Sequence, residues 1–308
     1  MVAGAWQVVD LTDFSGSVRY VRGNLRVIRK SENKPIDLPL ATIAMLLIGN
    51  SAAISGAVLS KLSEYDIPLL VCDWRKVPVA GAIPWREHTR IGARQQAQAT
   101  LSIPRRKRAW SSIVRAKIKG QAATLSDLNL QSDANQLHKL ATTVRSGDPD
   151  NGEAQAARIY WSAISGSTGF IRLPGGGLDA WNASLDYTYT VLRGHGIRAI
   201  TAAGLSGALG VFHHGRGNPF ALVDDLIEPF RPSIDAYIFQ SISIDNSLSS
   251  EIRRSLVASC DRTFNDEGQS LPTVFTSFAQ NFGRYVEGDL ADLPVPIWKG
   301  QVDAKERS

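Results

Sequence analysis

Residues 210–235 carry the side chains of this chain that are best suited to binding a metal ion. Two adjacent histidines, His213 and His214, precede a Gly- and Pro-rich loop, and carboxylates follow it. If the stretch after the loop is helical, Asp225 and Glu228 project from one face because they are three residues apart. The apolar residues between them form the opposite, buried face. Either histidine can then fold back towards Glu228, and such a set of donors is typical of a divalent metal site.

Four motifs in this chain resemble those of one protein family. Gly210–His213 reads Gly-x-x-His, which ends a helix in that family, and Asp225–Arg231 matches an Asp-Leu-x-Glu-x-Phe-Arg motif. Upstream, Glu153–Trp161 closely matches a helix that reads Glu-Ala-x-x-Ala-Arg-x-Tyr-Trp. Asp179–Tyr189 is similar to an Asn-Ala-x-Leu-Asn-Tyr-x-Tyr segment, with Asp186 where Asn is more usual. By these motifs the chain resembles the CRISPR adaptation integrases, the large catalytic subunits that insert new spacers into a CRISPR array.

This resemblance implies a catalytic site. Glu153, His213 and Glu228 correspond to the catalytic metal ligands, and the motif spacing selects His213 over His214. Asp225 is expected to be an extra ligand or a hydrogen-bond acceptor behind one. Two carboxylates and an imidazole suit Mg²⁺ or Mn²⁺, whereas a structural zinc site more often recruits cysteine. The implied reaction is attack by a 3′-hydroxyl of spacer DNA on a phosphodiester at the edge of a repeat, and with water in its place the site acts as an endonuclease.

The resemblance also implies partners. It predicts a homodimer formed through the N-terminal domains, and a hetero-hexamer in which two such dimers flank a dimer of the small second CRISPR adaptation subunit. Double-stranded DNA, as spacer precursor and as repeat, is the expected substrate. The short chain and the motifs around Pro219 and Pro229 are similar to the type II branch, so the RNA-guided effector nuclease of the same locus is a further expected partner.

The candidate ligands also have structural alternatives. Asp150–Glu153 fits a capping box, in which Asp150 accepts a hydrogen bond from the third helical amide and Glu153 bonds back. Taken alone, this pattern favours capping, and the family resemblance makes the metal role the preferred one. Glu228 could pair with Arg231, three residues on. The prolines at positions 229 and 232 argue against a regular helix there, since an interior proline costs roughly 3 kcal/mol.

Basic residues are concentrated in residues 86–119, which contain ten Lys or Arg residues and one acidic residue, Glu87. The scarcity of acids favours a surface that follows a DNA backbone, and the alternative is a solvated helix face. The candidate DNA-binding residues in this stretch are Arg105, Arg106, Lys107, Arg108, Arg115, Lys117 and Lys119. Outside it, the candidates are Arg75, Lys76 and Arg216.

The composition is that of a folded, water-soluble chain. It has 308 residues, of which 44% are hydrophobic and 20% charged, enough for one large or two ordinary domains. The net charge of +5 permits a nucleic-acid partner without requiring one. No apolar run is long enough to cross a bilayer and no secretory signal is visible, so we predict a cytoplasmic protein without a membrane partner. The two cysteines, Cys72 and Cys260, predict neither a disulfide framework nor a zinc motif.

We predict an α+β fold in which an N-terminal β-sandwich-like domain is followed by an all-α catalytic domain. Residues 17–29 alternate as two strands around a Gly23-Asn24 turn, whereas the segments after residue 95 have helical spacing. The predicted domains are a dimerisation domain of residues 1–95, a catalytic domain of residues 96–290 and a C-terminal tail of residues 291–308. The last ten residues are expected to be frayed.

Two other classes of function remain open at this point. A non-catalytic, basic DNA-binding scaffold would use the basic stretch but not the set of Glu153, His213 and Glu228. A metal-dependent hydrolase of small phosphoesters would use that set but not the basic stretch. A DNA integrase uses both.

Overall fold

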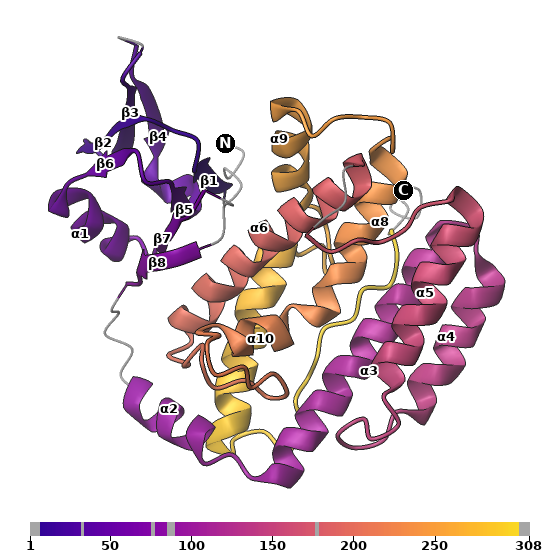
Figure 1. Ribbon diagram of the computed structural model, residues 1–308. Coiled ribbons are helices and arrows are strands. Elements are labelled where there is room, and N and C mark those ends of the chain that lie inside the picture. The colour runs from indigo at the N-terminus through magenta and orange to yellow at the C-terminus, as the bar shows by residue number, and fades with distance from the viewer. Residues whose placement is uncertain (1–6, 32–33, 75–77, 85–89, 176–178, 302–308) are drawn as a thin grey trace.

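A computed structural model describes residues 7–31, 34–74, 78–84, 90–175 and 179–301 (Figure 1). Its strands are β1 (Gln7–Leu11), β2 (Gly16–Val21), β3 (Asn24–Arg29), β4 (Ile36–Pro39), β5 (Ile43–Ile48), β6 (Ala52–Ile54), β7 (Leu69–Cys72) and β8 (Pro78–Ala82). Its α-helices are α1 (Gly56–Glu64), α2 (Ile91–Ala99), α3 (Ile103–Asp127), α4 (Gln131–Thr143), α5 (Gly152–Thr168), α6 (Ala180–Ala202), α7 (Ala221–Leu226), α8 (Arg231–Ser241), α9 (Ser250–Ser259) and α10 (Leu271–Glu287). Two 3-10 turns, η1 (Leu40–Thr42) and η2 (Glu228–Phe230), complete the described elements.

The N-terminal region consists of two four-stranded sheets, with strand orders β1-β5-β7-β8 and β4-β3-β2-β6. Strand β5 lies inside the first sheet and is buried at every position. Its side chains alternate: Leu46 and Ile48 join the core between the sheets, whereas Met45 and Leu47 join the core shared with the helices. A strand covered on both faces needs an uninterrupted apolar sequence, which β5 has. The predicted strand-rich N-terminal region and the α+β class are thus confirmed.

The predicted hairpin of residues 17–29 is present as β2 and β3. Asn24 pairs with Val21, so the turn consists of Arg22 and Gly23, one residue earlier than expected. Both residues have a positive φ, 45° for Arg22 and 84° for Gly23. This conformation matches the right-handed twist of a two-residue hairpin, and glycine adopts it without steric cost.

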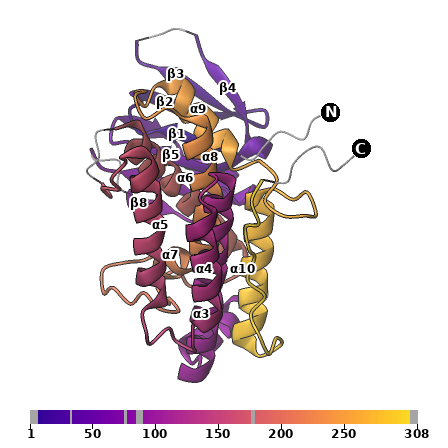
Figure 2. The ribbon, with the colours of Figure 1, turned by 90° about the vertical axis from the view of Figure 1, so that its right-hand side faces the viewer.

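The region after residue 95 is mostly helical, as predicted, and its first helix begins slightly earlier, at Ile91. Helix α3 is 25 residues long and packs against α4, α5, α8 and η2. Figure 2 shows α3, α4 and α5 running alongside one another. Helix α10 buries Phe275, Phe278 and Phe282 and packs against α6 and α2. The consequence is a helical layer in which α3 is central and its buried face lies next to both α5 and η2.

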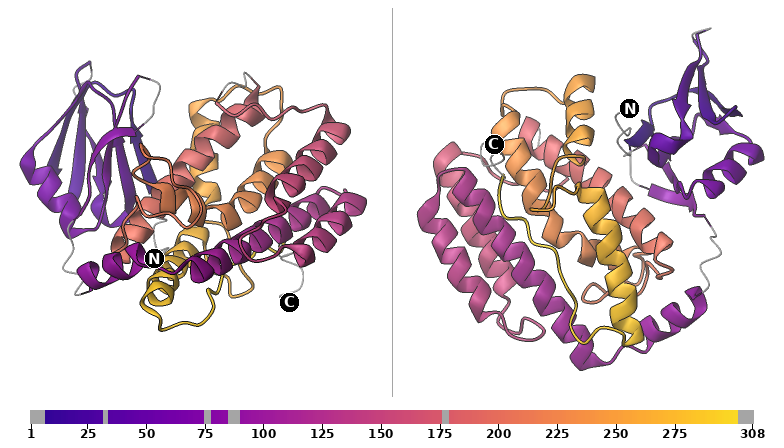
Figure 3. Two further views of the ribbon diagram at one scale, coloured as in Figure 1. Left: turned by 60° about the horizontal axis from the view of Figure 1, so that its bottom comes forward. Right: turned by 180° about the vertical axis from the view of Figure 1, so that it is seen from behind.

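Helix α6 connects the two regions, because it packs against β5 (Figure 3). The approach is close at Gly194, where an added Cβ would lie 2.7 Å from the sulfur of Met45. Residue 95 lies within α2, so the expected domain boundary there stays a prediction. The described part of the tail is anchored by Leu293 and Trp298, which are buried in the helical core. Among the described helices, none is long and apolar enough to span a bilayer.

Candidate active site

Glu153 lies in the first turn of α5, and the capping box that residues 150–153 offered as an alternative role is not formed. The carboxylate of Asp148 accepts hydrogen bonds from the backbone N–H groups of Gly152, at 2.8 Å, and Glu153, at 3.0 Å. Asp150 instead forms an exposed ion pair with Arg145. Because Asp148 satisfies the amides at the start of the helix, the Glu153 carboxylate is not needed for capping. Its Oε1 accepts a hydrogen bond from Nζ of Lys117 at 2.6 Å.

Glu228 begins the 3-10 turn between α7 and α8, where the chain departs from regular α-helix as the two prolines predict. Its side chain is 7% exposed and forms two ion pairs, with Nζ of Lys117 at 2.7 Å and with Nε of Arg231 at 3.2 Å. The predicted Glu228–Arg231 pair is therefore present. Burial alone would raise the pKa of Glu228, but Arg231 and Lys117 outweigh it and hold the pKa below its ordinary value.

His213 lies in the loop between α6 and α7, not at the end of a helix as the motif predicted. Its Nδ1 is 2.7 Å from Oδ1 of Asp225, which is fully buried. The other Asp225 oxygen accepts hydrogen bonds from the backbone N–H groups of Val211, at 2.5 Å, and Phe212, at 2.9 Å. Asp225 thus fixes both the loop and the imidazole, and we assign the Nδ1–H as donor, which leaves Nε2 as an acceptor.

The charge of Asp225 also changes the acidity of His213. The hydrogen bond from the imidazole to Asp225 raises the pKa of His213, and the nearby charges of Glu228 and Glu153 raise it further. Of the two roles expected for Asp225, the contacts favour the acceptor behind a ligand, because both its oxygens are already engaged.

Lys117 lies in the candidate site, a position that the sequence analysis did not predict. We expected it on a DNA-binding surface, but its ammonium lies between Glu153 and Glu228 and its side chain is only 14% exposed. Burial would lower the pKa of Lys117, but Glu228 and Glu153 outweigh this and raise it. A signal was present in the sequence: Lys117 continues the helical spacing of the buried residues Trp110, Val114 and Gln121.

The side chains of Glu153, Glu228 and His213 offer donor atoms of the kinds that bind divalent cations. Two carboxylates converge on one positive charge, and a third donor, the imidazole, is held by a carboxylate as metal-binding histidines usually are. Oε2 of Glu228 is buried and lacks a hydrogen bond of good geometry, although the Lys117 ammonium is near it. In the part of the chain that the structure describes, no three Asp, Glu, His or Cys side chains converge at ligand distance. The donor chemistry fits Mg²⁺ or Mn²⁺, with Lys117 supplying the positive charge between the carboxylates.

A buried polar cluster supports the site from behind. Asp235 on α8 accepts hydrogen bonds from Tyr160 of α5, at 2.9 Å, and Tyr189 of α6, at 2.5 Å. Burial raises the pKa of Asp235 to about 6. The guanidinium of Arg231, which pairs with Glu228, lies over the Tyr189 ring at 4.6 Å. This cluster therefore links α5, which carries Glu153, to α8, which follows the turn that carries Glu228.

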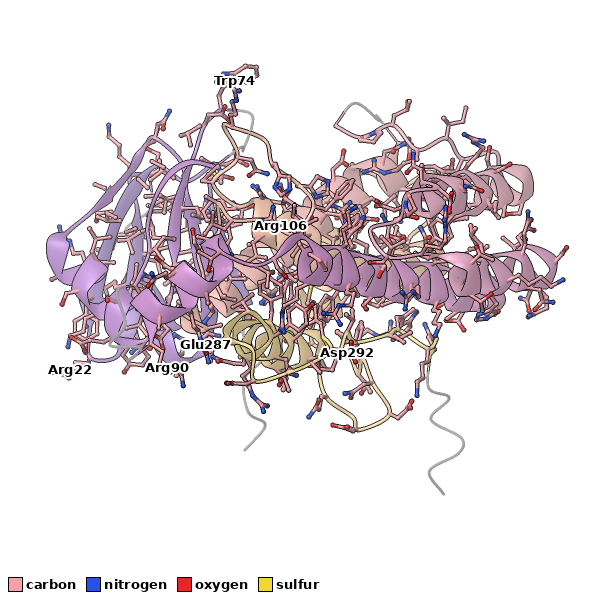
Figure 4. All side chains as sticks on the ribbon, turned by 90° about the horizontal axis from the view of Figure 1, so that it is seen from below. Arg22, Trp74, Arg90, Arg106, Glu287 and Asp292 are labelled. Carbon is pink, nitrogen blue, oxygen red and sulfur yellow. The ribbon has the colours of Figure 1, made fainter. Side chains whose placement is uncertain are left out.

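Three of the candidate DNA-binding residues, Arg105, Arg115 and Lys117, bind groups within the protein, and a DNA-binding role for the others stays a prediction. Arg105 donates hydrogen bonds to the carbonyl oxygens of Tyr285 and Leu290, so it holds the C-terminal end of α10 against α3. Arg115 donates to Ser111 one turn earlier on α3. Exposed residues among the candidates are Lys107, Arg108, Lys119 and Arg216. Arg106, which is labelled in Figure 4, is half-buried, and Arg75 and Lys76 lie outside the described residues.

The fold and the site together define a class: a protein with strand-rich sheets and a helical domain that gathers two glutamates, a lysine and a carboxylate-bound histidine. The sequence model of the family CRISPR associated protein Cas1 matches residues 11–249. The CRISPR-associated endonuclease Cas1 of Neisseria meningitidis serogroup C is 34% identical over 263 residues, which are 84% of each chain. The corresponding protein of Korarchaeum cryptofilum is 28% identical, over 82% of this chain and 84% of its own. The chain belongs to the Cas1 family.

Solved structures share this fold. A casposase bound to integration product has a TM-score of 0.75 at 17% identity and covers 98% of this chain and 97% of its own. A CAS1 protein from Thermotoga maritima has a TM-score of 0.73 at 16% identity, over 94% of this chain and 99% of its own. At these identities the comparison establishes the common fold.

Proposed function

We propose that this chain is a metal-dependent DNA integrase and endonuclease that inserts spacer DNA into a CRISPR array. The observation that carries the proposal is the convergence of Glu153 and Glu228 on one cation, beside the imidazole that Asp225 holds. The relatives named as CRISPR-associated endonucleases, and the structural neighbour titled as a casposase bound to integration product, support the same class of chemistry.

The metal would be held by Glu153, Glu228 and Nε2 of His213. Mg²⁺ or Mn²⁺ bound there would supply positive charge to the reacting phosphate. Asp225 keeps the imidazole in the tautomer that presents Nε2, and Arg231 keeps the Glu228 carboxylate ionised. Lys117 would have to leave at least one carboxylate, because the ammonium and the metal need the same oxygens.

In the proposed reaction, the oxygen of a DNA 3′-hydroxyl forms a bond to the phosphorus of a target phosphodiester. The bond from that phosphorus to its original 3′-oxygen breaks, and the leaving oxygen takes up a proton as the attacking hydroxyl loses one. One phosphodiester replaces another, so no external energy source and no covalent protein intermediate is required. With water as the attacking group, the products are those of an endonuclease.

Membership of the Cas1 family also supports a proposal about the partners of this chain. A chain of the solved Cas6-RT-Cas1–Cas2 complex covers 97% of this chain and 36% of its own, with a TM-score of 0.72 at 18% identity. This supports Cas2, the small second adaptation subunit, as partner. We extend the proposal to a homodimer through the N-terminal sheets, a hetero-hexamer around one Cas2 dimer, contact with the effector nuclease of a type II locus, and a cytoplasmic location. Double-stranded DNA would contact the exposed Lys107, Arg108 and Lys119.

The test is strand transfer by purified protein with its Cas2 partner. A fluorescent duplex and a plasmid that bears a repeat are incubated with Mn²⁺, with Mg²⁺, or with a chelator. We expect Glu153→Ala, His213→Ala and Glu228→Ala each to abolish integration while a thermal melt shows a folded protein. Full activity in any one variant would remove that residue from the site, and full activity with the chelator would refute the metal.

A further inference from the structure

Phe212 exposes an aromatic ring directly beside the candidate catalytic histidine. Its side chain is 49% exposed, and its inner face is stacked on the buried ring of Trp110. The two ring centroids are 4.3 Å apart and the ring planes differ by 4°. The Phe212 and His213 rings meet edge to face at 5.4 Å. Covering the exposed face of this ring with another flat group would remove apolar surface from water, which is favourable.

The ring is held in place from several directions. The Phe212 backbone N–H donates a hydrogen bond to Asp225 at 2.9 Å, so the carboxylate that holds His213 also fixes the backbone of Phe212. At Gly210 an added Cβ would lie 2.9 Å from Oδ2 of Asp225, which requires a glycine for this tight loop. Stacking on Trp110 then leaves one flat face of Phe212 without a partner among the described residues. Such a rigid ring loses little conformational entropy when a second flat group stacks on it.

The surroundings of Phe212 favour a nucleic acid over a protein. Residues 213–216, which follow Phe212 in the loop, are exposed, and each of them is either a polar residue or a glycine. A cavity of about 310 Å³ adjoins the loop, and Arg106, His214 and Arg216 line it together with Gln98 and Asn218. Its lining contains no carboxylate, and within the described chain neither Arg106 nor Arg216 forms an ion pair. One apolar ring next to unpaired cations suits a single nucleobase and its phosphate, because a protein partner would need a wider apolar area.

We propose that Phe212, backed by Trp110, is a stacking platform for one unpaired nucleobase of the DNA, whose adjacent phosphate enters the cavity of Arg106, His214 and Arg216. This inference rests on the proposed function and adds a binding role for residues outside the ligand set. Because every base has an aromatic face, stacking here is independent of base identity. It places a strand end beside His213 and thereby positions the DNA for reaction.

The experiment uses the full chain and 2-aminopurine, a fluorescent base that is quenched when it stacks. The probes are forked duplexes with a single-stranded 3′ overhang, labelled in turn at each overhang position and bound in the presence of a chelator. Phe212→Leu keeps an apolar side chain but removes the flat ring, and Phe212→Tyr keeps the ring. We expect quenching at one or two positions with the wild type and with Phe212→Tyr. For Phe212→Leu we expect no quenching and roughly tenfold weaker binding of the overhang.

Absence of quenching at every position in the wild type, or equal quenching and affinity in Phe212→Leu, would overturn the platform. Loss of Cas2 binding or of the dimer in Phe212→Leu, with DNA affinity unchanged, would assign the ring to a protein interface and also overturn it. Glu153→Ala separates this inference from the proposed function. That variant should lose integration and keep the quenching, whereas a wild type that stacks the base but never integrates DNA would refute the function alone.

Discussion

Asp225 shows how one buried carboxylate serves both the local structure and the chemistry of this site. Its two oxygens accept from three consecutive backbone N–H groups, those of residues 211–213, and from the His213 ring. Lys117 has a comparable double role, because its charge compensates two glutamates that would otherwise repel each other. Both residues therefore connect stability with the proposed metal binding.

Asp225→Asn should lower the pKa of His213 and loosen the loop. The asparagine side chain lacks the negative charge that raises this pKa. Its NH₂ group would also replace one of the carboxylate oxygens that accept hydrogen bonds from backbone N–H groups. We expect the variant to lose about 1–3 kcal/mol of unfolding free energy. An NMR titration of His213 and a denaturant melt measure the two effects. Asp224→Asn is the matched control, since Asp224 pairs with Arg193, and an identical His213 titration in both variants would contradict the assignment.

Lys117→Met should make the protein less stable without metal and more responsive to Mn²⁺. Removing the ammonium leaves Glu153 and Glu228 close together with Arg231 as the remaining cation, which should cost roughly 3 kcal/mol. Mn²⁺ would then bind without displacing an ammonium, so the melting temperature should rise more with added Mn²⁺ than in the wild type. Lys119→Met removes the same charge from an exposed position of α3 and should change neither quantity. An equal Mn²⁺ response in all three proteins would show that Lys117 does not compete with the metal.

At the scale of elements, the start of α5 and the turn between α7 and α8 determine where the two glutamates point. Asp148 satisfies the first amides of α5, and η2 redirects the chain at Glu228 before α8 begins at Arg231. Helix α3 lies against both, so its Lys117 reaches the two carboxylates. The two glutamates and Lys117 are thus carried by one helix N-terminus, one 3-10 turn and one helix face, and the loop between α6 and α7 adds His213.

Asp148→Ala should destabilise the first turn of α5 by about 1 kcal/mol, because two amides lose their acceptor. The Glu153 carboxylate would then be positioned less precisely, and we expect strand transfer to fall together with the melting temperature. Asp150→Ala serves as the control, since Asp150 forms an exposed ion pair and its loss should have little effect. If Asp150→Ala were the more damaging change, the capping assignment to Asp148 would be wrong.

At the scale of the whole molecule, α6 is the helix that connects the sheets with the helical domain, and it carries a buried histidine. His195 is 4% exposed, and its Nε2 has no hydrogen-bond partner among the described residues. Burial, with a smaller contribution from Arg198, lowers the pKa of His195 to about 4. The neutral form is therefore the one that the folded protein accommodates.

The lowered pKa of His195 predicts that the folded protein loses stability at acid pH. The folded-state pKa is lower than the unfolded value of 6.5, so the contribution of His195 to stability is complete above pH 6.5 and is lost as the pH falls towards 4. The loss amounts to about 3 kcal/mol, from 1.36 kcal/mol per pKa unit. His195→Leu should show a weaker decline of unfolding free energy between pH 7 and pH 4.5 than the wild type. His138→Leu, which changes an exposed histidine, should follow the wild type, and parallel curves for all three would refute the prediction.

Features that depend on local order could be predicted from the sequence. The 3.6-residue spacing after residue 95 and the alternation of residues 17–29 predicted the helices and the hairpin, because both periods are properties of neighbouring residues. The spacing of Asp225 and Glu228, and the match around Glu153, likewise selected the candidate site. The cap of α5 is local, but it comes from Asp148 and not from the capping box that residues 150–153 suggested. Which charges meet at the site depends on how the helices pack. Lys117 is 36 residues from Glu153, and the two meet because α3 packs against α5. The stacking of Phe212 on Trp110 and the pairing of β1 with β5 were invisible for the same reason: both contacts arise only once distant segments fold together and exclude water.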